Sequence, residues 1–192
     1  METRIATCDL VSISPYSQSK AIETARGNTP ADEHEKNTWR ERIHRDEKGF
    51  VIIPPMAFVN NIQRAAKYSG MKVKGQRNAT YTKHFNSGVM VVEPAIIYNE
   101  NGSRYLADEV PYDYLFVPSD GKPGGGSRVF KYFPRINNWT ATVQYHIIDE
   151  VITKEAFSQI LVIGGNLIGI GRFRPENRGY YGRFTVKDIK WS

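Results

Sequence analysis

Strict alternation of apolar and polar residues marks positions 139–147 as a β-strand. Every second residue from Trp139 to Ile147, Tyr145 included, is apolar or aromatic and lies on one face. The threonine, glutamine and histidine residues between them lie on the other face. A period of two with one apolar face is typical of a strand that buries one side. Positions 4–14 are equally rich in β-forming residues but are apolar on both faces, which predicts a central strand in a covered sheet.

Two stretches repeat their apolar residues with the period of an α-helix. In the first, Pro54 and Pro55 precede the repeat and Gly70 ends it, as helix starts and stops require. In the second, Thr153 is a good N-cap residue. Two glycines, Gly164 and Gly165, weaken the last turns of this helix. Positions 30–45 could form a surface helix, because acidic residues come early and basic residues late.

Shorter β patterns fill the rest of the chain. The expected elements are a strand at 49–53, a β region at 80–98 followed by a turn, and a hairpin of 112–117 with 127–133 around a glycine-rich tip. The closing strand, 184–191, changes its apolar face part-way, which predicts a bulge around Lys187.

The order of these elements predicts an α+β fold. Strand, helix, an inserted β-rich segment, strand, helix and strand are the outline of a ferredoxin-like (RRM-like) sandwich. A chain of 192 residues suits one domain, 1–192. We expect residues 75–135 to be a β-hairpin-rich insertion in that domain.

Composition excludes several protein classes. With 40% hydrophobic and 24% charged residues, the chain is neither disordered nor fibrous, and no apolar run is long enough to cross a membrane. The first residues form neither a secretory signal nor a transit peptide, so we expect a soluble, cytoplasmic protein. The single cysteine, Cys8, lies in a strand pattern where a buried, inert thiol is expected. We expect no metal and no cofactor.

Positive charge is concentrated in a few runs. The formal net charge is +6, and residues 71–84 and 121–148 hold lysines and arginines with no acidic residue between them. Aromatic residues are interleaved with these cations. Cations that bind phosphate and aromatic rings that stack on bases are the combination that single-stranded nucleic acid needs, whether RNA or DNA.

Residues 167–184 hold both glycines and arginines at high density. The glycines let the backbone approach a ligand closely, and the arginines supply charge and bidentate phosphate geometry. The segment is neither a P-loop, since no Gly-Lys-Ser or Gly-Lys-Thr follows, nor a Rossmann fingerprint, since it follows a helix and enters a strand. We predict that it binds a sugar-phosphate backbone; a flexible connection with solubilising arginines is the alternative.

The candidate RNA-binding residues lie in this segment and in the two basic runs. They are Gly169, Gly171, Arg172, Arg174, Arg178, Gly179, Tyr180, Gly182, Arg183, Lys83, His84, Arg128 and Lys131.

Three motifs resemble the RAMP superfamily of CRISPR-associated proteins, in particular the backbone subunit that polymerises along the guide RNA. They are Ile13-Ser14-Pro15 after the opening strand, Phe50-Val-Ile-Ile-Pro-Pro55 before a helix, and the glycine-rich segment from Gly169 to Phe184. In that family the second motif is usually an Ile-Pro-Gly-Ser-Ser-Leu-Lys-Gly type turn; here Pro55-Met56-Ala57-Phe58 replaces the glycine and serines.

The resemblance implies a palm that holds RNA against the glycine-rich loop, and an inserted hairpin thumb that reaches between nucleotides. The partners it implies are guide RNA, copies of the chain, other CRISPR effector subunits and a possible single-stranded DNA target, with a role in antiviral defence. No membrane partner is expected.

Two other functions remain open. Some RAMP relatives cleave RNA with a histidine as acid or base, so His84 and His146 are candidates for a guide-processing endoribonuclease. Asp113 and Asp120 are candidates for the loop aspartate of target-cleaving relatives, although Asp120-Gly121 is more simply a turn. A phage-type CRISPR inhibitor or an assembly-capping protein could use the same fold. We expect a protein without catalytic activity.

Overall fold

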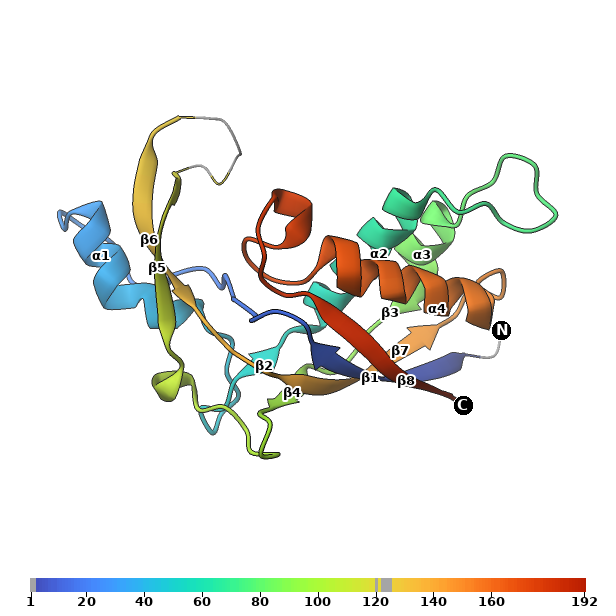
Figure 1. The fold of residues 1–192 in the computed structure, drawn as a ribbon, viewed down its shortest axis with the longest axis horizontal. Helices are drawn as coiled ribbons and strands as arrows, with labels where there is room; N and C mark the ends of the chain where they lie inside the picture. The colour runs from blue at the N-terminus through green and yellow to red at the C-terminus, as the bar shows by residue number, and fades with distance from the viewer. Residues whose placement is uncertain (1–2, 120, 122–125) are drawn as a thin grey trace.

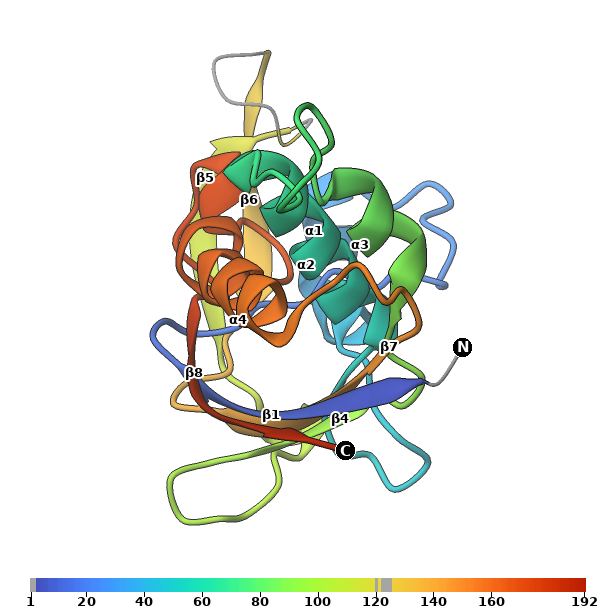
Figure 2. The ribbon, with the colours of Figure 1, turned by 90° about the vertical axis from the view of Figure 1, so that its right-hand side faces the viewer.

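A computed structural model describes residues 3–119, 121 and 126–192 of the chain. Its main body has two layers, a curved antiparallel sheet and helices over one face of that sheet (Figures 1 and 2). The strand order is β2-β4-β7-β1-β8, and β3 also pairs with β7. The strands are β1 (Arg4–Ser12), β2 (Ile52–Ile53), β3 (Val89–Met90), β4 (Ala95–Tyr98), β7 (Thr140–Ile147) and β8 (Phe184–Trp191).

The sheet buries only one of its faces. In β1, Ala6, Cys8 and Leu10 are buried, while Thr7 and Asp9 between them are only half-buried. β1 is central, between β7 and β8, as predicted. The expectation that both of its faces are covered is wrong, because the helices pack on one side alone.

The bulge expected in the closing strand is present. Leu10 pairs with Val186, and Asp9 pairs with Asp188, so Lys187 is the extra residue of β8. The extra residue moves the side chains that follow it to the other face of the strand.

The two long helices form where the sequence predicts them. α2 (Pro55–Ser69) has proline in its first turn and ends at Gly70 with φ 58°, a left-handed conformation that glycine adopts without strain. α4 (Lys154–Ile163) begins where the Thr153 side chain accepts a hydrogen bond from the Ala156 amide. A π-helical turn, η3 (Gly164–Ile168), follows it.

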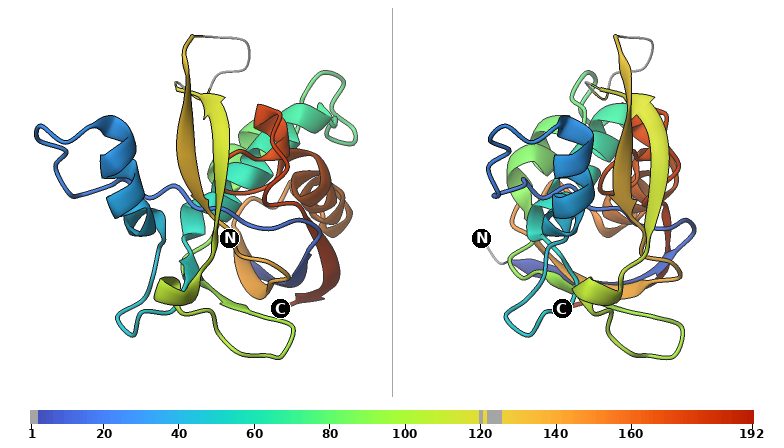
Figure 3. Two further views of the ribbon diagram at one scale, coloured as in Figure 1. Left: turned by 60° about the vertical axis from the view of Figure 1, so that its left-hand side comes forward. Right: turned by 90° about the vertical axis from the view of Figure 1, so that its left-hand side faces the viewer.

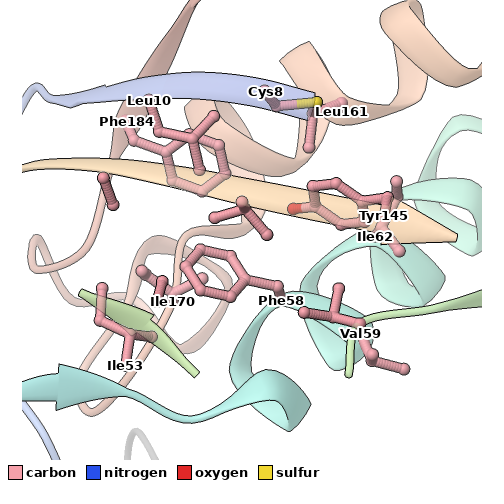
Figure 4. Close-up of a cluster of buried hydrophobic side chains, with 14 of the residues drawn as sticks. Cys8, Leu10, Ile53, Phe58, Val59, Ile62, Tyr145, Leu161, Ile170 and Phe184 are labelled. Atoms are coloured by element: carbon pink, nitrogen blue, oxygen red, sulfur yellow. The ribbon is translucent and has the colours of Figure 1, made fainter. Parts of the chain in front are cut away.

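The core lies between these helices and the sheet. Phe58 and Ile62 of α2, Tyr145 of β7 and Phe184 of β8 are fully buried there (Figure 4). Burying such a side chain stabilises the fold by about 1.5–3 kcal/mol. Cys8 belongs to this core, and burial raises the pKa of its thiol to about 12, so the expectation of a buried thiol is confirmed.

One expected β segment is partly a helix. Residues Thr82–Gly88 form α3, and only the residues after them enter the sheet as β3 and β4. Packing explains the difference, because the Phe85 ring stacks on Phe157 of α4 at 6.4 Å between centroids. Tertiary contacts of this kind override the local preference of a short segment.

A separate hairpin stands beside the two layers. It consists of β5 (Tyr112–Pro118) and β6 (Arg128–Pro134) and rises between α1 (Ala31–Thr38) and the carboxy-terminal loop (Figure 3). The predicted insertion 75–135 thus contributes β3 and β4 to the main sheet and β5 and β6 to this hairpin. Asp120 and residues 122–125 of its tip lie outside the described residues.

Short helical turns connect the remaining segments. They are the 3₁₀ turns η1 (Trp39–Arg42), η2 (Ala107–Glu109) and η4 (Pro175–Asn177). α1 and η1 occupy the range predicted as a surface helix. Within the described part of the chain, the helices are too short or too polar to cross a membrane.

Candidate nucleic-acid interface

The glycine-rich loop, residues 169–183, is fixed at its start by α2. The side-chain amide of Asn61 donates hydrogen bonds to the carbonyl oxygens of Gly164 and Gly169, each at 2.8 Å. Asn61 is 2% exposed, so these two bonds form away from water. They attach the loop to the middle of the helix.

The glycines of the loop face the protein's own atoms. Gly169, Gly171 and Gly182 have φ between 73° and 78°. A Cβ at Gly171 would meet the Ser17 carbonyl, and one at Gly182 would meet the Ile170 carbonyl. A Cβ at Gly179 would likewise meet the backbone of the same loop. Close internal packing therefore accounts for these glycines, and contact between them and a ligand stays a prediction.

The three motifs that carry the family resemblance meet at this loop. The Gly182 amide donates to the Pro15 carbonyl at 2.7 Å, and the Arg183 amide donates to the Ser14 hydroxyl at 2.9 Å. The Pro54 end of the second motif lies across a pocket from Gly169. Segments from the two ends of the chain and from the start of α2 thus form one site.

That pocket, which we call the central groove, has a volume of about 400 Å³. Its walls are the first half of α2, the start of the glycine-rich loop, and the residues Tyr16, Ser19 and His44. Two further pockets, of about 280 and 430 Å³, lie between the hairpin and the same loop; together we call them the hairpin groove. Gly171 and Arg174 line both the central groove and the first of these pockets. The pockets are therefore neighbours along the glycine-rich loop, and we refer to the three together as the path.

Positive charge dominates this path. The lysines and arginines that line it are Arg64, Arg128, Lys131, Arg172, Arg174 and Arg178. Among the described residues that line these three pockets, none is an aspartate or a glutamate. A groove with walls of one sign attracts ligands of the opposite sign.

Arg172 is held inside the protein. Its side chain is 14% exposed, its guanidinium lies 3.9 Å from the centre of the Phe133 ring, and it donates to the Tyr132 carbonyl at 2.9 Å. Burial, together with the nearby Arg42 charge, lowers its pKa to about 10. These contacts join the loop to the hairpin, which favours a structural role for this candidate.

Arg174 is paired with an acid beside the groove. Its guanidinium donates to the Glu176 carboxylate at 2.9 and 3.1 Å, and Arg64 of α2 donates to the same carboxylate at 2.8 Å. Burial alone would raise the pKa of Glu176, but the hydrogen bonds from the two arginines outweigh it and lower the pKa. Both arginines share one acid, so positive charge remains.

The other two loop arginines make no ion pair with any described carboxylate. Arg178 is exposed, adopts φ 59° and lines the hairpin groove. Arg183 is half-buried and donates to the Asn166 carbonyl at 3.0 Å. Of the four predicted arginines, Arg178 is thus the one whose charge faces the groove without an acidic partner in the described residues.

Asp113 connects the hairpin to the glycine-rich loop. Its carboxylate accepts hydrogen bonds from the hydroxyls of Tyr180 at 3.1 Å and Tyr181 at 2.6 Å, and from Arg135 at 2.8 Å. Burial and the hydrogen bond to Asp113 raise the pKa of Tyr181. These bonds give Asp113 a structural place in the fold.

The hairpin exposes a row of aromatic rings, and Phe116 of this row also lines the hairpin groove. Tyr114 stacks on Phe130 at 4.6 Å, and Phe116 lies 4.9 Å from Phe130; all three are about half exposed. Arg128 lies over Phe116, and Lys131 donates to the Ser119 carbonyl at 2.8 Å. Tyr114 and Phe116 were not among the RNA-binding residues predicted from the sequence, although the alternation of β5 places both on one face.

The two remaining candidates, Lys83 and His84, lie on α3, and no pocket of the path includes them. Lys83 is exposed, whereas His84 is 9% exposed. The Nδ1 of His84 is 2.7 Å from the Asp149 carboxylate. His146 is on the open face of the sheet, because its neighbours Tyr145 and Ile147 are buried under the helices. The two histidines are therefore not brought together.

Sequence reasoning missed Asn61 and Arg64. The signal for Asn61 was an amide on the apolar stripe of a helix, where a buried polar group needs hydrogen-bond partners. Among the described residues, no three histidine, cysteine or acidic side chains are grouped to hold a metal ion.

No protein-family model matches the sequence, and no curated protein matches it. Solved structures do match. The crystal structure of Cmr6 from Pyrococcus furiosus aligns over 97% of this chain and 99% of its own, with a TM-score of 0.50 and 14% identity. In fold, this chain is similar to Cmr6. The cryo-EM structure of the type III-B Cmr-beta bound to cognate target RNA gives a TM-score of 0.51 and 14% identity, over 99% of this chain and 61% of that one.

The Cmr similarity is one of fold. It extends over nearly the whole of this chain, so the mixed α/β body with its antiparallel sheet is an arrangement found in type III CRISPR Cmr proteins. This agrees with the resemblance to CRISPR-associated proteins seen in the three motifs.

Proposed function

We propose that the chain is a non-catalytic RNA-binding subunit of a CRISPR-type ribonucleoprotein, which holds guide RNA in the groove beside the glycine-rich loop. The observation that carries the proposal is the charge of that groove. Cations line it along its length, none of the described residues that line it is an aspartate or a glutamate, and Glu176 beside it is shared by two arginines. RNA supplies the matching negative charge at every phosphate.

The body of the fold serves as a ferredoxin-like palm in this proposal. The strand order β4-β7-β1-β8 and the chain order strand, α2, strand, β7, α4, β8 are those expected for a β-α-β-β-α-β unit. The hairpin of β5 and β6 is the thumb. The similarity to Cmr6 and to a Cmr-beta complex bound to target RNA supports this assignment.

Arg178 and Arg128 are the groove residues assigned to phosphates, and Tyr180, 43% exposed, is placed to stack on a base. Arg172 and Arg174 keep the loop in place. Copies of the chain that line up along one guide RNA would add to the affinity. The arrangement does not favour an endoribonuclease, because His84 is buried on α3 and His146 lies on the opposite face of the sheet.

Filter binding with labelled guide-type RNA across a salt series tests the proposal. We expect affinity to fall steeply with salt. The double variant Arg128→Ala with Arg178→Ala should lower affinity for all sequences alike and reduce the slope of log affinity against log salt by about 1.4. The matched control, Lys187→Ala with Lys190→Ala on β8, loses the same charge outside the groove and should leave the slope unchanged.

An affinity that does not depend on salt would refute the proposal, as would equal effects of the two double variants. Discrete RNA fragments that disappear in His84→Ala or His146→Ala would show an enzyme instead.

A further inference from the structure

We propose that the RNA path continues past the central groove along the exposed face of α2 and ends at the basic loop between α2 and α3, residues 70–81. This inference rests on the proposed function and extends its binding site. It adds to that site a further pocket, the rest of the exposed face of α2 and a charged run.

A pocket joins the central groove directly. It has a volume of about 590 Å³ and lies between α2 and α3; we call it the helix groove. Asn60 and Arg64 line both grooves. A strand that leaves the glycine-rich loop therefore meets a continuous surface.

The α2 residues of the helix groove form one stripe. They are Asn60, Gln63, Arg64, Lys67 and Tyr68, at the spacing i, i+3, i+4, i+7 and i+8 of a single helix face. The buried residues of α2, such as Ile62 and Ala65, form the opposite face. At 1.5 Å per residue the stripe is about 12 Å long, which matches three to four stacked nucleotides at about 3.4 Å each.

The chemistry of this stripe suits single-stranded nucleic acid. Its amides, with Asn86 of α3 across the groove, offer both donors and acceptors to bases and ribose hydroxyls. Tyr68 is 65% exposed, an aromatic ring open for stacking. Lys67 is exposed, and the acid at this groove, Glu176, is already bonded to Arg64 and Arg174.

The loop beyond the stripe extends the positive charge. Lys72, Lys74 and Arg77 are exposed on it, and the chain has no acidic residue from Gly70 to Val92. The loop projects past the ends of α2 and α3, at the upper right of Figure 1. An acidic protein surface would also be attracted to this charge. A nucleic-acid strand fits better, because the groove is continuous with the central groove and offers a ring for stacking.

Binding of oligoribonucleotides of increasing length, from about 4 to about 16 nucleotides, tests this extension. The triple variant Lys67→Ala, Lys74→Ala and Arg77→Ala should bind long RNA more weakly, with a salt slope smaller by about 2, and bind the shortest RNA as the wild type does. The control Lys48→Ala, Lys187→Ala and Lys190→Ala removes the same charge from exposed positions away from the groove and should bind long RNA normally.

A second pair of variants tests stacking. Tyr68→Ala should weaken binding of long RNA by about 5- to 150-fold, and Tyr68→Phe should restore it, because the ring is kept.

An equal loss of affinity for short and long RNA, or no loss of affinity in the triple variant, would overturn the extension while leaving the proposed function. Competition by polyglutamate as strong as that by RNA would overturn it in favour of an acidic protein partner. A wild-type protein that binds RNA of no length would refute the proposed function itself.

Discussion

Replacement of Asn61 by aspartate should show how strongly the glycine-rich loop depends on α2. Asn61→Asp keeps the shape of the side chain but replaces the amide that donates to the carbonyls of Gly164 and Gly169. When the introduced carboxyl group is ionised, it loses both hydrogen bonds and points negative charge at two carbonyl oxygens. Leaving buried groups unpaired costs about 1–3 kcal/mol each, so we expect the free energy of unfolding to fall by about 2–5 kcal/mol at neutral pH.

The cost should depend on pH in a defined direction. Burial raises the pKa of the introduced carboxyl group in the folded protein above its unfolded value of about 3.9. The neutral form can donate one hydrogen bond, so stability relative to the wild type is best below pH ~4. It then declines as pH rises through the folded pKa.

Urea unfolding followed by circular dichroism at several pH values measures this difference. Asn60→Asp is the matched control, because Asn60 is exposed on the same helix and gains the same charge. A pH-independent cost, or a cost equal to that of the control, would show that the amide does not hold the loop. In RNA binding, Asn61→Asp should lose affinity along with stability, because the loop forms one wall of the groove.

Two further predictions concern backbone strain and an acid–histidine pair. Gly182→Ala should lower the free energy of unfolding by about 2–4 kcal/mol, because φ is 75° and the added methyl meets the Ile170 carbonyl. The control Gly102→Ala, also at φ 75° but in open space, should lower it by about 1 kcal/mol. Equal losses of the two variants in thermal unfolding would contradict the packing argument. Burial opposes ionisation of Asp149, but the hydrogen bonds from His84 and the Val151 amide and the nearby charges of His84 and Arg4 together outweigh burial and lower the pKa of Asp149. The pair with His84 should therefore stabilise the fold above pH ~4 and lose that contribution as pH falls through the lowered pKa. Acid titration of unfolding in Asp149→Asn should lack this component, and an acid transition unchanged from the wild type would show that the pair does not matter.

Periodicity was enough to predict the elements that bury one clear face. The alternation of β7, the apolar stripe of α2 and the change of face around Lys187 all reflect packing against a single core. α3 could not be predicted this way, since its helical form depends on Phe85 meeting Phe157 from a distant part of the chain. The uncovered face of β1 was missed because that strand is apolar on both sides in the sequence.

Charge in the sequence located the candidate site but could not sort its arginines. Arg172, Arg174 and Arg178 look alike in a glycine-rich segment, and their roles differ only through residues that the fold brings to them. Tyr132 accepts a hydrogen bond from the first, and Glu176 pairs with the second. The third meets no described acid. Such differences need distances, which a single sequence does not contain.

The hairpin and the glycine-rich loop share one small apolar cluster, formed by Val117, Phe133 and Tyr181. Because these walls are attached to each other, the width of the cleft between them is set before a ligand arrives. A pre-organised cleft loses little conformational entropy on binding. We therefore expect association to be limited by encounter, without a slow closing step, and to be as fast at low salt as electrostatic steering allows.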